Sequence, residues 1–244
     1  MVDSVQQTAK YDVVIPYRTP SNFSEEELRY ALRSISKNFL SLRNLYIIGD
    51  CPNWVKEVIH IPTNQYYSKV DNVRGAYHLA VGLPGLSEDF VIWHDDVYLL
   101  EPISEIPLWY GDSLQEFLAK YQSRYPFSYY TAIIERTTHS LPMELPHWEL
   151  HTPYKVNKRA FAEQLKTYVG QGILGRTLYC NMFHQGEGQY HQDVKLYEVP
   201  GSLGWQNEQR FKTFASSDDK TFFQVFYPVL REMFPSPCKF EDSI

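Results

Sequence analysis

Apolar residues along the first hundred positions form short β-branched runs, separated by segments with helical spacing. Such runs predict strands at 11–15, 45–48, 58–61 and 90–93. Helical spacing predicts helices over 25–39 and 71–82, and the first begins with a capping-box pattern, Ser24-x-x-Glu27. Strands and helices that alternate in this way predict an α/β fold with a mostly parallel central sheet flanked by helices.

The second half of the chain is less regular. Apolar spacing predicts helices over 113–124, 157–168 and 222–233. The run Tyr129–Ile134 predicts a strand, and 135–155, rich in Pro, His and Glu, predicts a long connection. Glycines predict loops at 170–175 and 186–188. The chain shows no internal repeat, low-complexity tract or linker, so we expect one domain over 1–244.

Composition and charge narrow the class of protein. The 244 residues are 43% hydrophobic and 21% charged, with a net charge of −6, which is typical of a soluble globular protein and argues against a broadly basic nucleic-acid binder. Three widely spaced cysteines without a CxxC pair favour reduced thiols. No signal peptide and no apolar run of about 18 residues is found, so we expect a cytoplasmic protein with no membrane span.

Charged residues follow the ends of the predicted strands. Tyr17-Arg18, Asp50 and His94-Asp95-Asp96 each come directly after one of them. Carboxyl ends of parallel strands meet at one edge of a sheet, and ligands bind there. Two carboxylates within the apolar segment FVIWHDDVYLL need compensation, because burial of an unpaired charge is costly. Mg²⁺ or Mn²⁺ would supply the compensating positive charge. As the structural alternative, the two carboxylates cap a turn or pair with an arginine.

The FVIWHDD segment resembles the DxD region of GT-A-type nucleotide-sugar glycosyltransferases, in which an apolar strand ends in acids that hold a metal diphosphate. The resemblance implies a GT-A-like single domain, with 1–100 as the nucleotide-binding half and 101–244 as the acceptor-side half. It implies Asp96 as the direct metal ligand and Asp95 near the ribose or a metal-bound water. His94 stands in the place of the first acid, and the cofactor would be Mn²⁺ or Mg²⁺.

Further segments resemble the Stealth sugar-phosphate transferases and small, often phage-encoded proteins classed with the glycosyltransferases. They are ELRYALRSISKNFLSLRNLYIIGD (27–50), LSEDFVIWHDDVYLL (86–100), HTPYKVNKRAF (151–161) and FASSDDKTF (214–222). Stealth proteins carry an Asp-containing block of the YTWVDGSD type after the first strand, whereas this chain reads VVIPYRTPS. The resemblance therefore implies a shared architecture and leaves the reaction open.

Several other positions are candidate donor contacts. Lys69, Asn72 and Arg74 lie near the start of the predicted helix over 71–82, where backbone N–H groups and cations suit a diphosphate. Arg18 has a similar role, Tyr17 would stack on the base, and Asp50 would accept hydrogen bonds from uracil or ribose. A solvated helix face and a loop cap are the structural alternatives.

Acids and histidines in the second half are the candidate catalytic residues. Asp218 and Asp219 precede the last helix, where one would cap it and Asp219 would act as a base or metal ligand. His147, Glu149 and His151 alternate in PHWELHTP and would share one face of an extended segment. Glu149 or His151 could then be the acceptor base, with a zinc site or a purely structural role as alternatives.

The sequence thus predicts an enzyme that moves a sugar from a nucleotide sugar, most simply UDP-linked, to an acceptor hydroxyl. The acceptor would be a glycan or a hydroxymethylated base in phage DNA, in the host cytoplasm if the gene is a phage's. Cations on the predicted helix over 157–168 would contact DNA phosphates, or form a solvated face: Lys155, Lys158, Arg159 and Lys166. The alternatives are a Stealth-like sugar-1-phosphate transferase and a non-catalytic nucleotide- or glycan-binding module.

Overall fold

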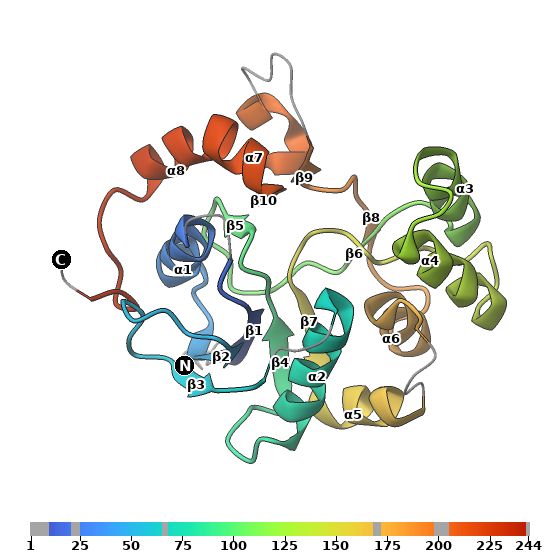
Figure 1. Ribbon diagram of the computed structural model, residues 1–244, viewed down its shortest axis with the longest axis horizontal. Helices are drawn as coiled ribbons and strands as arrows, with labels where there is room; N and C mark the ends of the chain where they lie inside the picture. Colours follow the sequence, from blue (N-terminus) through green and yellow to red (C-terminus); the bar gives the residue numbers. More distant parts are fainter. Residues whose placement is uncertain (1–9, 21–24, 65–67, 168–171, 198–204, 243–244) are drawn as a thin grey trace, which may run out of the picture. The chain divides into compact units, whose positions relative to one another are not determined.

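The computed structural model describes residues 10–20, 25–64, 68–167, 172–197 and 205–242. The chain divides into two compact units, and the second interrupts the first. Unit 1 comprises the described residues of 1–106, 152–158 and 194–244, and unit 2 those of 107–151 and 159–193. Figure 1 shows the elements of both units in chain order.

Unit 1 is built on a five-stranded sheet. Its strands are β1 (Tyr11–Tyr17), β2 (Leu42–Gly49), β3 (Ile59–Ile61), β4 (Asp89–Ile92) and β7 (Tyr154–Asn157). They lie in the order β3-β2-β1-β4-β7; the first four are parallel, and β7 runs antiparallel to β4. The predicted α/β fold with a mostly parallel sheet is therefore confirmed.

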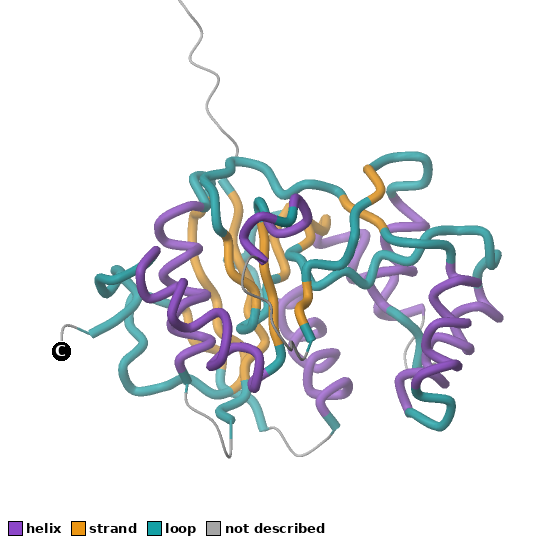
Figure 2. The backbone as a smooth tube through the Cα atoms, turned by 90° about the horizontal axis from the view of Figure 1, so that it is seen from above, coloured by secondary structure: helices purple, strands orange, loops and turns teal. Residues whose placement is uncertain are grey.

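Helices α1 (Glu26–Asn38) and α2 (Lys69–Gly82) lie on opposite faces of this sheet (Figures 1 and 2). Right-handed crossovers require this arrangement, because β1 connects to β2 in one direction and β3 connects to β4 in the other. The central strands are consequently continuous apolar runs, such as Val13–Ile15 and Phe90–Ile92, that are fully buried. The strand order changes direction between β1 and β4, which is where open α/β sheets bind ligands.

A second, three-stranded sheet completes unit 1. It consists of β5 (Val97–Leu99), β10 (Phe214–Ser217) and β9 (Lys195–Leu196), in the order β5-β10-β9. Short 3-10 turns precede β10, at Trp205–Asn207 and Gln209–Phe211. The predicted closing helix is present as α7 (Asp219–Thr221), a π-helical turn (Phe222–Phe226) and α8 (Tyr227–Met233).

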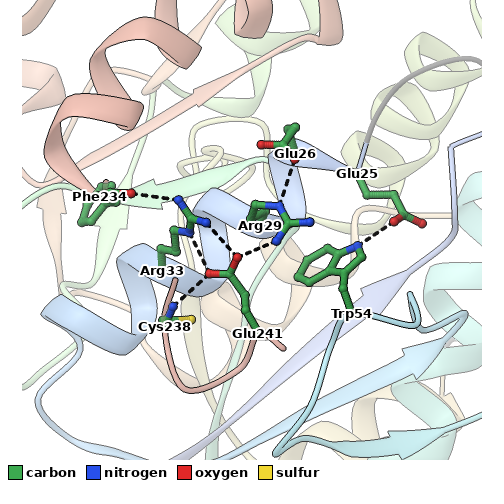
Figure 3. A network of polar contacts seen from close by, with 8 residues as sticks. All are labelled: Glu25, Glu26, Arg29, Arg33, Trp54, Phe234, Cys238 and Glu241. Carbon is green, nitrogen blue, oxygen red and sulfur yellow. Dashed lines mark hydrogen bonds and ion pairs between the residues drawn. The ribbon is translucent and has the colours of Figure 1, made fainter. Parts of the chain in front are cut away.

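Two arginines of α1 bind the segment that follows α8 (Figure 3). Glu241 is 2% exposed, and its carboxylate accepts hydrogen bonds from Arg29 Nη1 at 2.6 Å and Arg33 Nε at 2.7 Å. At the start of the same helix, Trp54 Nε1 donates to Glu25 at 2.7 Å. Removing one partner of such a buried ion pair costs about 3–5 kcal/mol. These contacts fix the first turns of α1.

Unit 2 is mainly helical. Its elements are α3 (Leu114–Arg124), α4 (Tyr129–Ser140), α5 (Lys158–Thr167, whose first residue belongs to unit 1), α6 (Gly175–Phe183), β6 (Trp109–Tyr110) and β8 (Gln189–Tyr190). The helix α3 begins at a complete capping box formed by Ser113 and Glu116. Strands β6 and β8 pair in parallel.

The structure overturns two predictions for this region. Residues 129–134 were expected to form a strand, but they begin α4. Ser128 caps this helix by accepting from Thr131 N at 3.0 Å, and the buried side chains recur at helical spacing. The long connection over 135–155 is shorter than expected, because α4 continues to Ser140 and β7 begins at Tyr154.

Some predicted features fall outside the described residues. They are Ser24 of the capping box, the end of the helix over 157–168, and the loop residues before Gly172. Within the described part of the chain, none of the helices combines the length and apolar character that a bilayer span needs.

Candidate functional site

Asp95 and Asp96 occupy the turn that leaves the sheet after β4. Val97 N donates to His94 O at 3.3 Å and closes this turn, after which β5 begins at once. The three preceding residues of β4 and Trp93 are fully buried. The apolar run therefore carries the two carboxylates to the carboxyl edge of the sheet, beside the end of β1.

A second pair of acids reaches the same place because of strand register. β10 runs antiparallel to β5, with Ser216 opposite Val97, so the end of β10 lies beside the beginning of β5. Asp218 Oδ1 accepts from Thr221 N at 2.8 Å and caps α7. Asp219 is exposed, and its charge acts on Glu27 of α1. Asp218 is therefore the helix cap, and Asp219 belongs to the site.

Glu27 is the site residue that sequence analysis missed. It was assigned to a capping box, but its carboxyl lies among Asp96, Asp95 and Asp219, in that order of influence on its pKa. Its Oε1 is buried and has no hydrogen-bond partner. The contacts of Figure 3 hold the backbone around it, with Arg29 on the same helix bound to Glu241.

The face of α1 that carries Glu27 gives the reason for this position. Ser34 Oγ accepts from Leu99 N at 3.1 Å, and Asn38 Nδ2 donates to Leu99 O at 2.7 Å. Glu27, Ser34 and Asn38 are seven and eleven residues apart, which places them on one helix face. Since Ser34 and Asn38 meet the end of β5, Glu27 meets its beginning, where Asp96 lies.

Crowding raises the proton affinity of these acids. Burial, followed by the charges of Asp96, Asp95 and Asp219, raises the pKa of Glu27 to about 9. Burial and the neighbouring Asp96 raise the pKa of Asp95 to about 6. Burial is the larger cause of both shifts, and the neighbouring carboxylates add to it. Such a place attracts a cation.

Two lysines supply part of the compensation. Lys195 Nζ lies 2.9 Å from Asp96 Oδ2, and the side chains are only 13% and 19% exposed. Ser216 pairs with Lys195 on one side and with Val97 on the other, so β10 brings this lysine next to the turn. Lys69, exposed in the first turn of α2, lowers the pKa of Asp95 against the larger effect of burial. Sequence analysis did not identify Lys195.

The other predicted donor contacts occupy the same edge of unit 1. Tyr17 ends β1, and burial together with the charge of Asp95 raises the pKa of its hydroxyl. Asp50 Oδ2 accepts from Thr19 N at 2.8 Å and so fixes the loop that follows β1, while Arg18 is exposed in that loop. Asn72 and Arg74 follow Lys69 on α2, both half-buried.

The donor set fits a divalent cation. Among the described residues, no three His, Cys, Asp or Glu side chains form a ligand group on their own. Mg²⁺, however, is ordinarily held by one or two carboxylates together with substrate phosphates and waters. The buried Oε1 of Glu27 has no hydrogen-bond partner, and Asp95 lies beside Asp96, so a cation bound at Asp95 and Asp96 would meet oxygen atoms that could hold it.

Glu149 and His151 lie in unit 2, and each has a local partner. Glu149 Oε1 accepts from Thr177 N at 2.9 Å, in the first turn of α6. His151 Nδ1 lies 2.9 Å from Asp193 Oδ2. His147 is buried and stacks on Phe117, with ring centroids 3.8 Å apart, and burial lowers its pKa to about 4. His147 is thus a core residue, and the three do not form a zinc ligand group.

The predicted cationic helix face is not formed as expected. Lys155 lies on β7, where its Nζ is 3.7 Å from Glu105 Oε2. Lys158 Nζ donates to the carbonyls of Leu83 and Leu86, just beyond α2. Both ammonium groups therefore have structural partners. Arg159 and Lys166 lie on α5, which begins one residue later than predicted, whereas Lys155 lies before the helix.

Neither the models of known protein families nor the curated proteins yield a match to this chain. The function of the site is therefore inferred from its own residues.

Proposed function

We propose that the chain is a GT-A-like glycosyltransferase that uses a nucleotide sugar, with the donor bound at the carboxyl edge of the unit 1 sheet. One observation carries the proposal. Four carboxyl groups, those of Glu27, Asp95, Asp96 and Asp219, converge with two lysines where the strand order changes direction. This combination suits a ligand that brings both a cation and phosphates.

The leaving diphosphate would be stabilised by positive charge from several sources. Asp96 and Asp95, with His94 beside them, would hold Mn²⁺ or Mg²⁺, which when bound neutralises charge that develops on the diphosphate. Lys69 would contact a phosphate oxygen from the first turn of α2, where helix N-termini in general favour anions. Lys195 holds Asp96 in place at 2.9 Å.

The nucleoside would lie over the ends of β1 and β2. Tyr17 is only 3% exposed, so the expected stacking of its ring on the base is not supported, whereas Asp50, fixed by Thr19 N, has a second oxygen for uracil or ribose. Arg18, with Asn72 and Arg74 of α2, would contribute further contacts to the donor.

Asp219 is the best-supported general base. In the transfer, an acceptor hydroxyl oxygen bonds to the anomeric carbon, the bond from that carbon to the diphosphate oxygen breaks, and UDP leaves with the electron pair. The acceptor proton would pass to the Asp219 carboxylate, which is exposed at the site. Glu149 is engaged at the start of α6. His151, the other base expected from the sequence, lies in unit 2, where its Nδ1 is 2.9 Å from Asp193 Oδ2.

A glycan acceptor fits the structure better than DNA does, because Lys155 and Lys158 are already engaged by protein groups. DNA as acceptor predicts duplex binding that weakens steeply between about 50 and 200 mM salt. If the chain does not bind duplex DNA at low salt, DNA is not the acceptor.

The test is release of nucleotide from UDP-sugars, with and without Mn²⁺, by wild type, Asp219→Asn and Glu232→Gln. Glu232 is an exposed carboxylate on α8 of the same unit and serves as the matched control. We expect UDP from wild type and the control, and about 100-fold less from Asp219→Asn. UMP in place of UDP would identify a sugar-1-phosphate transferase. Donor binding without any release would identify a binding module.

A further inference from the structure

Unit 2 contains a cavity of about 440 Å³, and none of the residues of the proposed donor site in unit 1 lines it. Its size is in the range of small-molecule sites, roughly 300–1,000 Å³. It lies between the strands β6 and β8, the start of α3, the segment after α4, and the loop 185–188 that follows α6. All of its lining residues belong to unit 2.

Close backbone approaches shape this cavity. A Cβ on Gly188 would come within 2.8 Å of Leu108 O and 3.1 Å of the Trp148 ring, and the residue has a φ of +86°. Only glycine adopts this conformation readily and allows that approach. The loop that carries Gly188 is thereby held against Trp148, so the wall of the cavity is a built feature of the fold.

The chemistry of the lining is aromatic and rich in acceptors. Tyr110, Trp148 and Tyr190 supply aromatic rings, and acids and amides supply oxygens. Among the described residues that line the cavity, none is Lys, Arg or His. An anionic ligand such as a phosphate would therefore meet only negative charge. A ligand with many hydroxyl donors and apolar C–H faces is complementary to both features.

Asn181 adds an oriented acceptor. It is 7% exposed, and its Nδ2 donates to Pro146 O and Thr177 O, both at 2.9 Å. Both N–H bonds of the amide are thus used. In a flipped amide, Oδ1 would instead face the carbonyl oxygens of Pro146 and Thr177, which cannot donate. Asn181 lines the cavity, and its Oδ1 is the amide atom that could accept a hydrogen bond from a ligand.

The carboxylates of the lining are not equivalent. Glu116 is used by the capping box of α3, and Glu187 accepts from His184 at 2.9 Å. Asp112 Oδ1 accepts from Tyr190 Oη at 3.0 Å, which orients the carboxylate and leaves its other oxygen for a ligand. Glu144 is exposed at the rim. Charge-assisted hydrogen bonds from ligand hydroxyls to Asp112 and Glu144 would be the strong polar contacts.

We propose that this cavity binds a saccharide with free hydroxyls, either neutral or amine-bearing, and not an anionic sugar. The role of this cavity as a glycan acceptor site rests on the proposed transfer. Its ability to bind a saccharide does not depend on that transfer. The tyrosine ring of Tyr190 would pack on the C–H face of the sugar, and Asn181 and Asp112 would accept from its hydroxyls.

The test is ligand-observed NMR of the full chain without donor, using cellobiose, chitobiose and glucose 6-phosphate at up to about 10 mM. We expect binding of the first two and none of the phosphate. Tyr190→Ala and Asp112→Asn should each weaken binding about tenfold. Tyr125→Ala is the matched control, because Tyr125 is 57% exposed like Tyr190, belongs to unit 2 and does not line the cavity.

The outcomes separate this inference from the proposed function. Binding that survives in both variants, or no binding of either disaccharide, would overturn it. Binding of spermidine in place of the disaccharides would identify a cation site and also overturn it. A chain that binds disaccharide but releases no nucleotide from UDP-sugars would keep the cavity and reject the transfer.

Discussion

Replacement of Glu27 by glutamine is expected to stabilise the protein in the absence of metal and nucleotide. Burial and three neighbouring carboxylates raise the pKa of Glu27 from 4.5 to about 9. At pH 7 the folded chain therefore holds a proton on this carboxyl that the unfolded chain has lost. Glutamine keeps the shape and the polar character of the protonated side chain and needs no proton.

The sign and the size follow from linkage. A carboxyl whose pKa is raised by folding favours the folded state fully below pH 4.5, and this contribution is lost as the pH rises toward 9. Each pH unit in this window is worth about 1.4 kcal/mol. Between pH 4.5 and 7 the loss reaches up to about 3 kcal/mol, which is the stabilisation expected of Glu27→Gln at pH 7.

The assay is urea unfolding in EDTA at pH 5, 6, 7 and 8, with the free energies of unfolding of variant and wild type compared at each pH. The advantage of Glu27→Gln should grow by about 1.4 kcal/mol per pH unit. Glu232→Gln, which removes one exposed carboxylate of the same unit, controls for net charge. A difference that is independent of pH, or a variant less stable than wild type at pH 8, would refute the proposed crowding of acids.

Three further predictions concern neighbouring charges and the core of unit 2. Asp96→Asn should lower turnover by about 100-fold in a UDP-release assay, with a change in the free energy of unfolding below about 1 kcal/mol, because relief of repulsion offsets the loss of its lysine partner. Lys195→Ala should lower the free energy of unfolding by about 2 kcal/mol, because it leaves Asp96 without its lysine partner. Lys56→Ala is the control: Lys56 and Asp242 are 3.9 Å apart with side chains 38% and 62% exposed, and its loss should cost less than about 0.5 kcal/mol. Wild type should lose stability between pH 6.5 and 4, because the unfolded chain protonates His147 there while the folded chain keeps it neutral down to pH about 4. His147→Leu should reduce this loss by up to about 3 kcal/mol. Equal loss of stability in variant and wild type, measured by urea unfolding at both pH values, would contradict this.

The parallel sheet was predictable because its inner strands β1, β2 and β4 are mostly buried, whereas the edge strand β3 is largely exposed and was found by its β-branched residues. Buried strands read as continuous apolar runs, and those at 11–15, 45–48, 58–61 and 90–93 all lie in or overlap β1 to β4. The edge strand β7 has the weaker pattern of an antiparallel strand, with Lys155 between two buried residues, and it was not predicted.

The site was predictable only as far as each acid follows a recognisable strand. Asp95 and Asp96 interrupt an apolar run, and Asp219 precedes a helix. Glu27 instead matched a local capping pattern, and its true environment depends on the packing of α1 along β5 and on the register of β10. Neither of these long-range contacts leaves a local signal, and the same holds for Lys195.

The contacts of Glu241 with α1 have a consequence for the order of folding. Arg33 and Glu241 are 208 residues apart along the chain. At a synthesis rate of about 5–20 residues per second, the helix would wait roughly 10–40 s for its carboxylate partner. The residues of unit 2 have all been translated before then, whereas the ion pairs of α1, together with Lys195 and Asp219, come late. We therefore expect unit 2 to form first on the ribosome, and the carboxylate cluster to be assembled last, by contacts of high sequence separation that fold slowly.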